Sequence, residues 1–351
     1  MKIHQKYISR CLELAKKGLI AARPNPSVGC VIVHDDHIIG EGYTSPYGGP
    51  HAEVNAIQSV QQQELLAAST LYVSLEPCNH FGKTPPCTDL ILAKGLKKVV
   101  VGTTDPHAKV AGTGIAKLMA SGCEVIVGVL EQECQEMNRR FFCFHQKQRP
   151  YIVLKWAQSR DGYLSPRHQK PGEPHWITNS YSRQLVHQWR SEEQAILVGA
   201  ATVLKDNPSL TVRDWSGPSP LRIILAPQQL LPLDAALFKD KVDTLLFSNV
   251  HQQNEVPESC TLLPWPESTT DLGYLMEELH SRHILSLFVE GGAQTLKAFI
   301  NQDLWDEMRV LEGPVVFHDG LQAPQAKGYL TKSTEVEGDR IDWYRKAKRY
   351  D

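Results

Sequence analysis

Three residues of types that bind zinc lie in two short segments of this chain. His51 lies in GGPHAEVNAI (48–57), and Cys78 and Cys87 lie in LEPCNHFGKTPPC (75–87). Zn²⁺ accepts imidazole nitrogen and thiolate sulfur, and a catalytic site keeps three protein ligands and one open position. Glu53 follows His51 by two residues, and a carboxylate beside a metal and its water can carry protons. These four residues predict a catalytic zinc site.

The spacing of the two cysteines needs an explanation. Zinc deaminases of nucleobases combine H-x-E with P-C-x-x-C, in which two residues separate the cysteines. Here eight residues lie between Cys78 and Cys87. A purely structural zinc would prefer four protein ligands. His80 could be that fourth ligand, or could replace Cys87, so a structural site stays open as an alternative.

Composition excludes several classes of protein. The formal net charge is -2, from 37 basic and 39 acidic side chains, so no overall field would attract nucleic acid or anionic lipid. No apolar run reaches the roughly 18 to 20 residues that a membrane-spanning helix needs. The N-terminal residues lack the apolar core of a signal peptide. We therefore expect a cytoplasmic protein that binds neither nucleic acid nor membrane, whose eight cysteines are free thiols and metal ligands.

The elements expected around the zinc ligands alternate between strands and helices. His51 and Glu53 open a helical segment, and the cysteines lie where a strand passes into the next helix. A hairpin around Asp35-Asp36 precedes them, so the sheet should be mixed, with helices on its faces. The expected helices are 3–18, 51–60, 87–95 and 112–122, and the expected strands are 28–34, 37–43, 69–75, 97–106 and 123–129.

A polar run that ends in proline, residues 146–150, divides the chain. Length favours two domains, since hydrophobic cores tend to split at this size. We expect domains at 1–146 and 150–351, both of the α/β class. The second half should contain strands at 151–157, 195–200, 221–227, 243–249 and 284–292, and helices at 180–193 and 269–282.

The first half resembles a known enzyme family. RPNPSVGCVIV (23–33), GGPHAEVNAI and LEPCNHFGKTPPC are similar to the deaminase domain of bifunctional riboflavin-biosynthesis deaminase/reductases, which has the long gap between its zinc cysteines. The resemblance implies a cytidine-deaminase-like three-layer fold with a mixed sheet. It also implies His51, Cys78 and Cys87 as zinc ligands and Glu53 as the catalytic proton donor and acceptor.

Each substrate contact predicted in this half has an alternative interpretation. By resemblance Asn25 hydrogen-bonds the edge of the pyrimidine, although between two prolines it could equally be a turn residue. His80, Lys83 and Thr84 add donors that suit a sugar-phosphate. We expect the loop between the cysteines to recognise the phosphoribosyl arm, against the alternative of an ordinary surface loop with a solvated Lys83.

The second half resembles the reductase of the same enzymes, which has a dihydrofolate-reductase-like fold. The similar segments are 150–165, 175–179, 187–213 and VEGGAQTLKAFI (289–300). The resemblance implies NADPH as the hydride donor. From residue type, Lys155 and Asp206 are candidates to polarise or protonate the opened sugar, and Arg190 and Arg213 suit a phosphate. Positions implied for the dinucleotide are Ala157, Trp176, Thr202, Asp206, Gly292, Ala293, Gln294 and Thr295, and those for the substrate are Arg190, Leu210, Arg213 and Glu290.

Three departures from the family pattern concern binding in the reductase half. Pro174 replaces a hydroxyl residue before Trp176, Ala226-Pro227 replaces a polar pair, and the late glycine-rich segment is altered at 313–320. We expect a bifunctional enzyme, both hydrolase and oxidoreductase, that deaminates a phosphoribosylaminopyrimidine and then reduces its ribosyl arm, acting as a homodimer. The alternatives are a deaminase whose second half binds without reducing, a deaminase of RNA or DNA bases, and a zinc-stabilised binding module.

Overall fold

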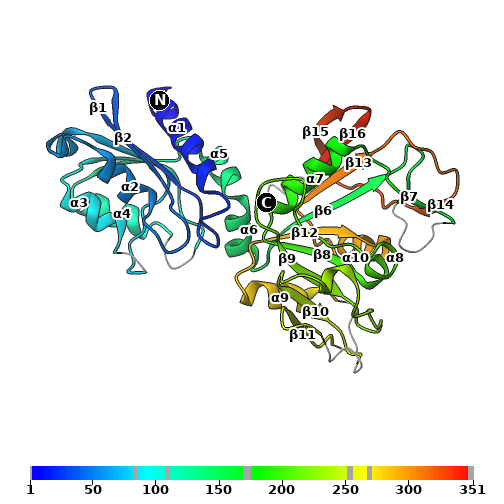
Figure 1. Cartoon of the computed structure of the whole chain (residues 1–351). Coiled ribbons are helices and arrows are strands. Elements are labelled where there is room, and N and C mark those ends of the chain that lie inside the picture. The colour runs from blue at the N-terminus through cyan, green and yellow to red at the C-terminus, as the bar shows by residue number, and fades with distance from the viewer. Residues whose placement is uncertain are drawn as a thin grey trace. The chain divides into compact units, whose positions relative to one another are not determined.

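The computed structural model describes residues 2–82, 85–107, 111–168, 175–250, 256–266 and 271–346. The chain forms two compact units, Met1–Arg149 and Pro150–Asp351, and each is described by itself. Figure 1 traces the elements of both units by residue number. Within the described residues, no helix has the length and apolar character needed to span a membrane.

The first unit is built on a mixed sheet with strand order β2-β1-β3-β4-β5. Strand β1 pairs antiparallel with β2 and β3, whereas β3, β4 and β5 are parallel. Asp35 and Asp36 both have positive φ, which fits the tight turn between β1 and β2. The expected hairpin and mixed sheet are therefore confirmed. The strands are β1 (Gly29–His34), β2 (His37–Tyr43), β3 (Thr70–Leu75), β4 (Lys98–Thr103) and β5 (Glu124–Val127).

Helices cover both faces of this sheet. Successive side chains of β1 point to opposite faces and nearly all are buried, so each face must be covered. Val31 and Val33 pack with one set of helices, and Cys30 and Ile32 pack with the other. The first set is α1 (Lys2–Gly18) and α5 (Glu131–Met137); the second is α2 (Ala52–Ser59), α3 (Cys87–Ala93) and α4 (Thr113–Ala120). Helix α6 (Arg139–Lys147) and the short η1 (Gln63–Ala68) complete the unit, and neither α5 nor α6 was expected from the sequence.

The second unit contains a larger sheet with strand order β11-β10-β9-β8-β12-β6-β13-β16-β15. It is parallel from β11 to β13, and β16 and β15 continue it antiparallel. Strands β7 and β14 form a separate antiparallel pair. The bounds are β6 (Tyr151–Gln158), β7 (Tyr163–Pro166), β8 (Ala195–Gly199), β9 (Leu221–Leu225), β10 (Thr244–Phe247), β11 (Cys260–Leu263), β12 (Ser286–Gly291), β13 (Glu307–Glu312), β14 (Gly320–Gln322), β15 (Tyr329–Val336) and β16 (Asp339–Arg345).

Helices lie on both faces of this sheet too. Leu287 and Val289 of β12 pack in the core with α9 and α10. Phe288, which points to the opposite face, lies beneath Arg309, which also stacks on Trp189 of α7. Because the parallel strands share one carboxyl edge, residues that follow them gather there. The helices are α7 (Ser180–Glu192), α8 (Ala200–Asp206), α9 (Gly273–Ser281) and α10 (Ala293–Asn301), with the short η2 (Ala236–Phe238).

Candidate active sites

The first unit brings His51, Cys78 and Cys87 together at the ends of three elements. His51 caps the N-terminus of α2, Cys78 follows β3, and Cys87 begins α3. The Nδ1 atom of His51 lies 3.5 Å from the Sγ atom of Cys78 and 3.4 Å from that of Cys87. The three ligand atoms lie within 4.8 Å of one another, and among the described residues this group has no fourth member, so His80 does not join it. Three ligands of these types fit a zinc ion with one open position.

The protonation of the two thiols suits a metal. The side chain of Cys87 hydrogen-bonds to Cys78 and lowers the pKa of Cys78 to about 4, and His51 favours the same thiolate. The same contact raises the pKa of Cys87, so the two sulfurs share one proton. The backbone N–H of Cys87 also donates to Cys78 Sγ at 3.3 Å. The fold therefore favours one thiolate ligand at this site.

Glu53 lies in the first turn of α2 and is only 4 % exposed. Burial raises the pKa of its carboxyl to about 7, and the charge of Cys78 acts in the same direction. A carboxyl that changes protonation near neutral pH can both accept and donate a proton. Glu53, His51 and Cys78 line one cavity of about 490 Å³, so an acid-base group faces the same space as the ligands.

Glu76, which the sequence reasoning missed, holds the loop that carries Cys78. Its carboxylate accepts four backbone N–H groups, from Asp105 and Gly112 on one oxygen and from Gly114 and Ile115 on the other, at 2.9 to 3.3 Å. A Cβ atom on Gly114 would lie 2.1 Å from the carbonyl oxygen of Pro77, so the two segments touch. The carboxylate therefore ties the residues before Cys78 to the N-terminus of α4.

The rest of the cavity mixes predicted and unexpected residues. Asn25 and His80, both predicted for the substrate, line it, whereas Lys83 and Thr84 lie outside the described residues. Asp105 and His107, which follow β4, line it because β4 is parallel to β3 and ends at the same edge. The sequence offered no signal for two lining residues from α6, Phe141 and His145, whose rings lie 4.4 Å apart between centroids.

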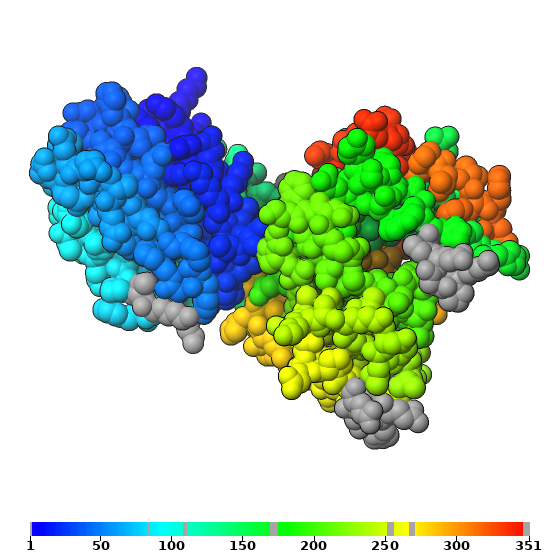
Figure 2. Space-filling view, in the orientation of Figure 1, coloured from blue at the N-terminus to red at the C-terminus, as the bar shows by residue number. Residues whose placement is uncertain are grey.

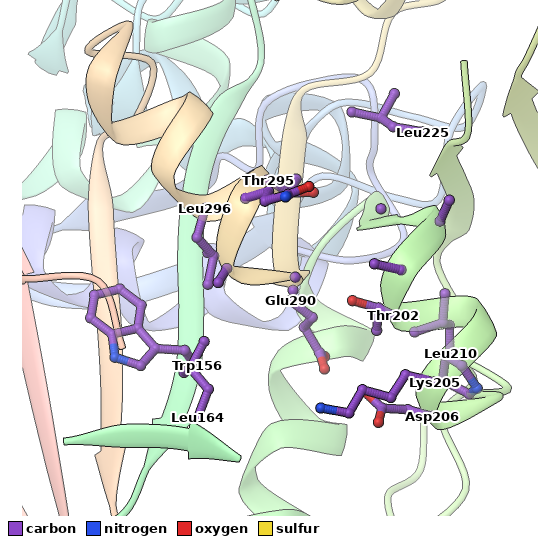
Figure 3. A pocket seen from close by; sticks show the side chains of 18 of the residues that line it. Trp156, Leu164, Thr202, Lys205, Asp206, Leu210, Leu225, Glu290, Thr295 and Leu296 are labelled. Atoms are coloured by element: carbon purple, nitrogen blue, oxygen red, sulfur yellow. The ribbon is translucent and has the colours of Figure 1, made fainter. Parts of the chain in front are cut away.

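The second unit contains a cavity of about 1630 Å³ at the carboxyl edge of its sheet. Figure 2 shows the surface of this unit hollowed between its yellow-green and orange segments. The residues predicted for the reductase half come together in this cavity, some of them labelled in Figure 3. They are Lys155, Ala157, Trp176, Arg190, Thr202, Asp206, Leu210, Arg213, Glu290, Gly292, Ala293, Gln294 and Thr295.

Three buried charges meet at one side of this cavity. Glu290 accepts two hydrogen bonds from Arg190, at 2.6 and 2.8 Å, and its Oε2 atom lies 3.8 Å from Lys155 Nζ. Burial alone would raise the pKa of Glu290, but the charges of Arg190 and Lys155 outweigh it and hold that pKa at about 2. Burial lowers the pKa of Lys155. The third nitrogen of Arg190, Nη1, donates to the carbonyl oxygen of Thr211 at 3.1 Å, so all three nitrogens of its guanidinium contact protein groups.

The segment predicted to hold the substrate is organised by His187, which the sequence reasoning missed. The backbone N–H of Arg213 donates to Nδ1 of His187 at 3.1 Å, so that nitrogen must be unprotonated. Burial lowers the pKa of His187 and favours this neutral form. Leu210 is buried with φ 56°, a strained conformation for a leucine. The hydrogen bond to His187 and the burial of Leu210 therefore hold the chain between α8 and β9 in one conformation.

Glycines at the centre of the cavity leave room for a phosphate-bearing ligand. A Cβ atom on Gly199 would lie 2.5 Å from Oγ1 of Thr295, and Gly292 has φ 71°. Gly292 is also the N-cap of α10, whose first N–H groups are available to an anion. The open cradle and the helix start fit the pyrophosphate of a dinucleotide.

The remaining predicted residues of this half lie at the borders of the cavity. Trp176 is 62 % exposed and stacks with Arg183, whose guanidinium carbon lies 4.4 Å from the ring centroid. Asp206 is exposed at the end of α8. Pro174 lies outside the described residues, and Ala226 donates its N–H to the carbonyl oxygen of Phe247.

Family models match both units. Residues 1–103 match the cytidine and deoxycytidylate deaminase zinc-binding region, and residues 150–338 match the RibD C-terminal domain. The riboflavin biosynthesis protein RibD of Aquifex aeolicus is 41% identical over 325 residues, which cover 91% of this chain and 89% of that protein. RibD of Escherichia coli is 36% identical over 324 residues, with 88% and 87% covered.

Two solved structures match along nearly the whole chain. A diaminohydroxyphosphoribosylaminopyrimidine deaminase/5-amino-6-(5-phosphoribosylamino)uracil reductase from Thermotoga maritima is 35% identical, with a TM-score of 0.86 and 99% of both chains covered. RibD of Acinetobacter baumannii is 32% identical, with a TM-score of 0.88 and the same coverage. The cytidine-deaminase-like and dihydrofolate-reductase-like folds expected from the sequence are therefore confirmed, as are zinc and NADPH as the cofactors. The chain belongs to the RibD family, the bifunctional enzymes of riboflavin biosynthesis that join a zinc-dependent deaminase to an NADPH-dependent reductase.

Proposed function

We propose that the first unit deaminates 2,5-diamino-6-(5-phosphoribosylamino)pyrimidin-4-one and that the second unit then reduces the ribosyl arm of the product to a ribityl chain. The Thermotoga maritima relative is a diaminohydroxyphosphoribosylaminopyrimidine deaminase and 5-amino-6-(5-phosphoribosylamino)uracil reductase, which supports this pair of activities. The observation that carries the proposal is the placement of His51, Cys78 and Glu53 around one cavity large enough for a pyrimidine.

In the deamination, water replaces the amino group of the ring and ammonia leaves. His51, Cys78 and Cys87 hold the zinc, which when bound makes water a stronger nucleophile at neutral pH. Glu53 takes one proton from the water and delivers it to the ring nitrogen, and then carries the second proton of the water to the departing amine, so that the C–N bond breaks, the ring carbonyl forms and ammonia leaves. Its buried position and its pKa of about 7 suit both directions of transfer. Asn25 orients the pyrimidine edge, and His80 and Lys83 hold the phosphoribosyl arm.

In the reduction, the bond between C1 and the ring oxygen of the ribosyl group breaks. NADPH supplies the hydride that C1 receives, and the ring oxygen needs a proton. Lys155 is the better of the two predicted acids, because it is buried with a lowered pKa whereas Asp206 is exposed. Glu290 keeps Lys155 in place and orients Arg190. Arg213 and Leu210 hold the substrate, and Trp176, Thr202 and residues 292–295 hold the dinucleotide.

The site residues, the domain boundaries at 146 and 150, the homodimer and the cytoplasmic location remain predictions. Absence of nucleic-acid and membrane binding is likewise part of the proposal, and it is supported by the near-neutral charge of the chain.

The test supplies the diaminopyrimidine substrate to the zinc-loaded chain with and without NADPH, and measures ammonia and the absorbance of NADPH. Ammonia should appear in both reactions, and NADPH should be consumed only when deamination has occurred. Glu53→Gln should block both signals, and supplying the deaminated compound should restore NADPH consumption. Ammonia without any NADPH loss would favour the alternative of a deaminase whose second unit does not reduce.

A further inference from the structure

Two residues of α7 contact the segment that carries Arg213. His187 and Arg190 occupy positions i and i+3 of the helix, so both side chains lie on one of its faces. The Nη1 atom of Arg190 donates to the carbonyl oxygen of Thr211 at 3.1 Å, and Nδ1 of His187 accepts the backbone N–H of Arg213 at 3.1 Å. Helix α7 therefore holds the backbone of this segment at two points.

Both nitrogens of the His187 imidazole face groups of this segment. Because Nδ1 accepts a hydrogen bond, the proton of the neutral ring is on Nε2, which lies 3.4 Å from the Oδ2 atom of Asp214. His187 is 5 % exposed, whereas the carboxylate of Asp214 is on the surface. The buried ring thus contacts two consecutive residues, Arg213 through its backbone and Asp214 through its side chain.

The guanidinium of Arg213 is available to an anion. Its Nη1 atom contacts two hydroxyl groups of its own segment, and the side chain lines the same cavity as Arg190. Within the part of the chain that the structure describes, no carboxylate forms an ion pair with Arg213, whereas Arg190 is paired with Glu290. A guanidinium without a carboxylate partner suits the phosphate of the substrate.

The backbone of Arg213 lies between an anchored and an exposed stretch. Leu210, labelled in Figure 3 beside the end of α8, is buried with φ 56°. The N–H of Val212 donates to Oγ of Ser219 at 3.1 Å, and residues 214–218 are exposed. The hydrogen bond to the imidazole lies at the border of this exposed stretch, so its loss would free the backbone from which the guanidinium extends.

We propose that His187 is a positioning residue of the reductase, whose neutral imidazole fixes the backbone of Arg213 and so directs the guanidinium at the phosphate of the substrate. This inference rests on the proposed reduction and concerns how its substrate is selected. In this role His187 acts through Arg213 and not on the reacting atoms. A charge-assisted hydrogen bond needs its donor at about 2.7 to 2.9 Å, so the anchor affects substrate binding more than hydride transfer.

Two variants of similar size separate the acceptor from the packing. His187→Leu removes the acceptor, and His187→Asn can place its Oδ1 atom where Nδ1 was. With NADPH and the deaminated compound, the zinc-loaded full chain should show a KM about tenfold higher in His187→Leu and a kcat within about threefold of the wild type. The preference for this compound over its dephosphorylated form, measured as a ratio of kcat/KM values, should fall by about tenfold and be largely restored in His187→Asn.

A double substitution shows whether His187 acts through Arg213. Arg213→Met removes the guanidinium. In that background His187→Leu should change the preference by less than about twofold, because the two residues belong to one network. The control, Gln184→Leu, changes an exposed position of the same helix and should leave both KM values unchanged.

The outcomes distinguish positioning from packing. An equal loss of preference in His187→Asn and His187→Leu, or a full effect of His187→Leu without the Arg213 guanidinium, would overturn the inference. His187→Phe keeps a ring in the buried site and is the second variant without an acceptor; if only His187→Asn folds, the role of His187 is structural and the inference fails. Absence of NADPH oxidation by the wild type would reject the proposed reduction, whereas normal oxidation with an unchanged preference in His187→Leu would reject this inference alone.

Discussion

Replacing Glu290 by glutamine tests whether the buried charge cluster of the second unit depends on its single carboxylate. Glu290 is 7 % exposed at its side chain and accepts two hydrogen bonds from Arg190. Glutamine keeps the size of the side chain but removes the negative charge. Two cations, Arg190 and Lys155, would then remain buried without a counter-charge, which is the costly way to break a buried ion pair.

The magnitude follows from the pKa of Glu290. Its value of about 2 lies below the ordinary 4.5, so the charged form is stabilised in the folded state. A shift of this size corresponds to about 3 kcal/mol, within the range measured for broken buried pairs. Because the folded pKa is lowered, this stabilisation is fully present above pH 4.5 and is lost as the pH falls toward 2. At pH 3 less than half of it should remain.

Tryptophan fluorescence reads this unit selectively, since all seven tryptophans lie between residues 150 and 351. In urea unfolding at pH 7, Glu290→Gln should lower the free energy of unfolding by about 3 kcal/mol relative to the wild type, and by less than half as much at pH 3. The control, Glu278→Gln, removes one partner of the more exposed ion pair with Arg282 and should lower the free energy of unfolding by less than about 1 kcal/mol. A loss at Glu290 equal to that of the control, or one that does not shrink in acid, would refute the reasoning.

Three further predictions concern the first unit. Glu53→Gln should reduce ammonia release by about 10² to 10⁴-fold while the zinc content, measured by atomic absorption, stays at one ion per chain; normal turnover would exclude Glu53 as the proton carrier. Glu76→Gln should lower the free energy of unfolding of the first unit by about 1 to 3 kcal/mol, because the amide nitrogen would face two backbone N–H donors. Zinc should be lost more readily on dialysis, whereas NADPH oxidation with the deaminated substrate should be preserved. Equal loss of both activities would contradict a role confined to the first unit. His80→Ala should weaken the preference for phosphorylated over dephosphorylated substrate in deamination, and an unchanged preference would leave the loop as a simple connection.

Local sequence patterns predicted the elements that carry the first site. Strand-forming runs, the Asp35-Asp36 turn and the helix starts at His51 and Cys87 each depend on a few neighbouring residues. Ligand chemistry depends on residue type, so candidate zinc ligands could be named before their distances were known. The resemblance to a known family accounted for the long gap between the cysteines, which is typical of that family.

Other features required the tertiary structure, because they join residues that are far apart in the chain. The sequence suggested that Arg190 binds the phosphate of the substrate, and only the fold shows that its guanidinium also hydrogen-bonds to Glu290, one hundred residues away. Glu76 likewise meets backbone groups that begin 29 residues later. No local pattern encodes which strand end lies beside which, since that depends on the order of strands in the sheet.

The amino-acid sequence by itself thus indicated the zinc chemistry of the first half through residue types and their short-range spacing, and the reductase chemistry of the second half through its resemblance to a known family. Only the tertiary structure decided which of these groups face a ligand and which face each other. The three candidate zinc ligands lie at adjoining element ends, whereas the same cavity is also lined by residues that follow β4, Asp105 and His107, and by residues of α6, Phe141 and His145. Burial, which the fold alone creates, then sets the pKa values of Glu53 and Lys155 in opposite directions, because a low-dielectric interior disfavours whichever form is charged.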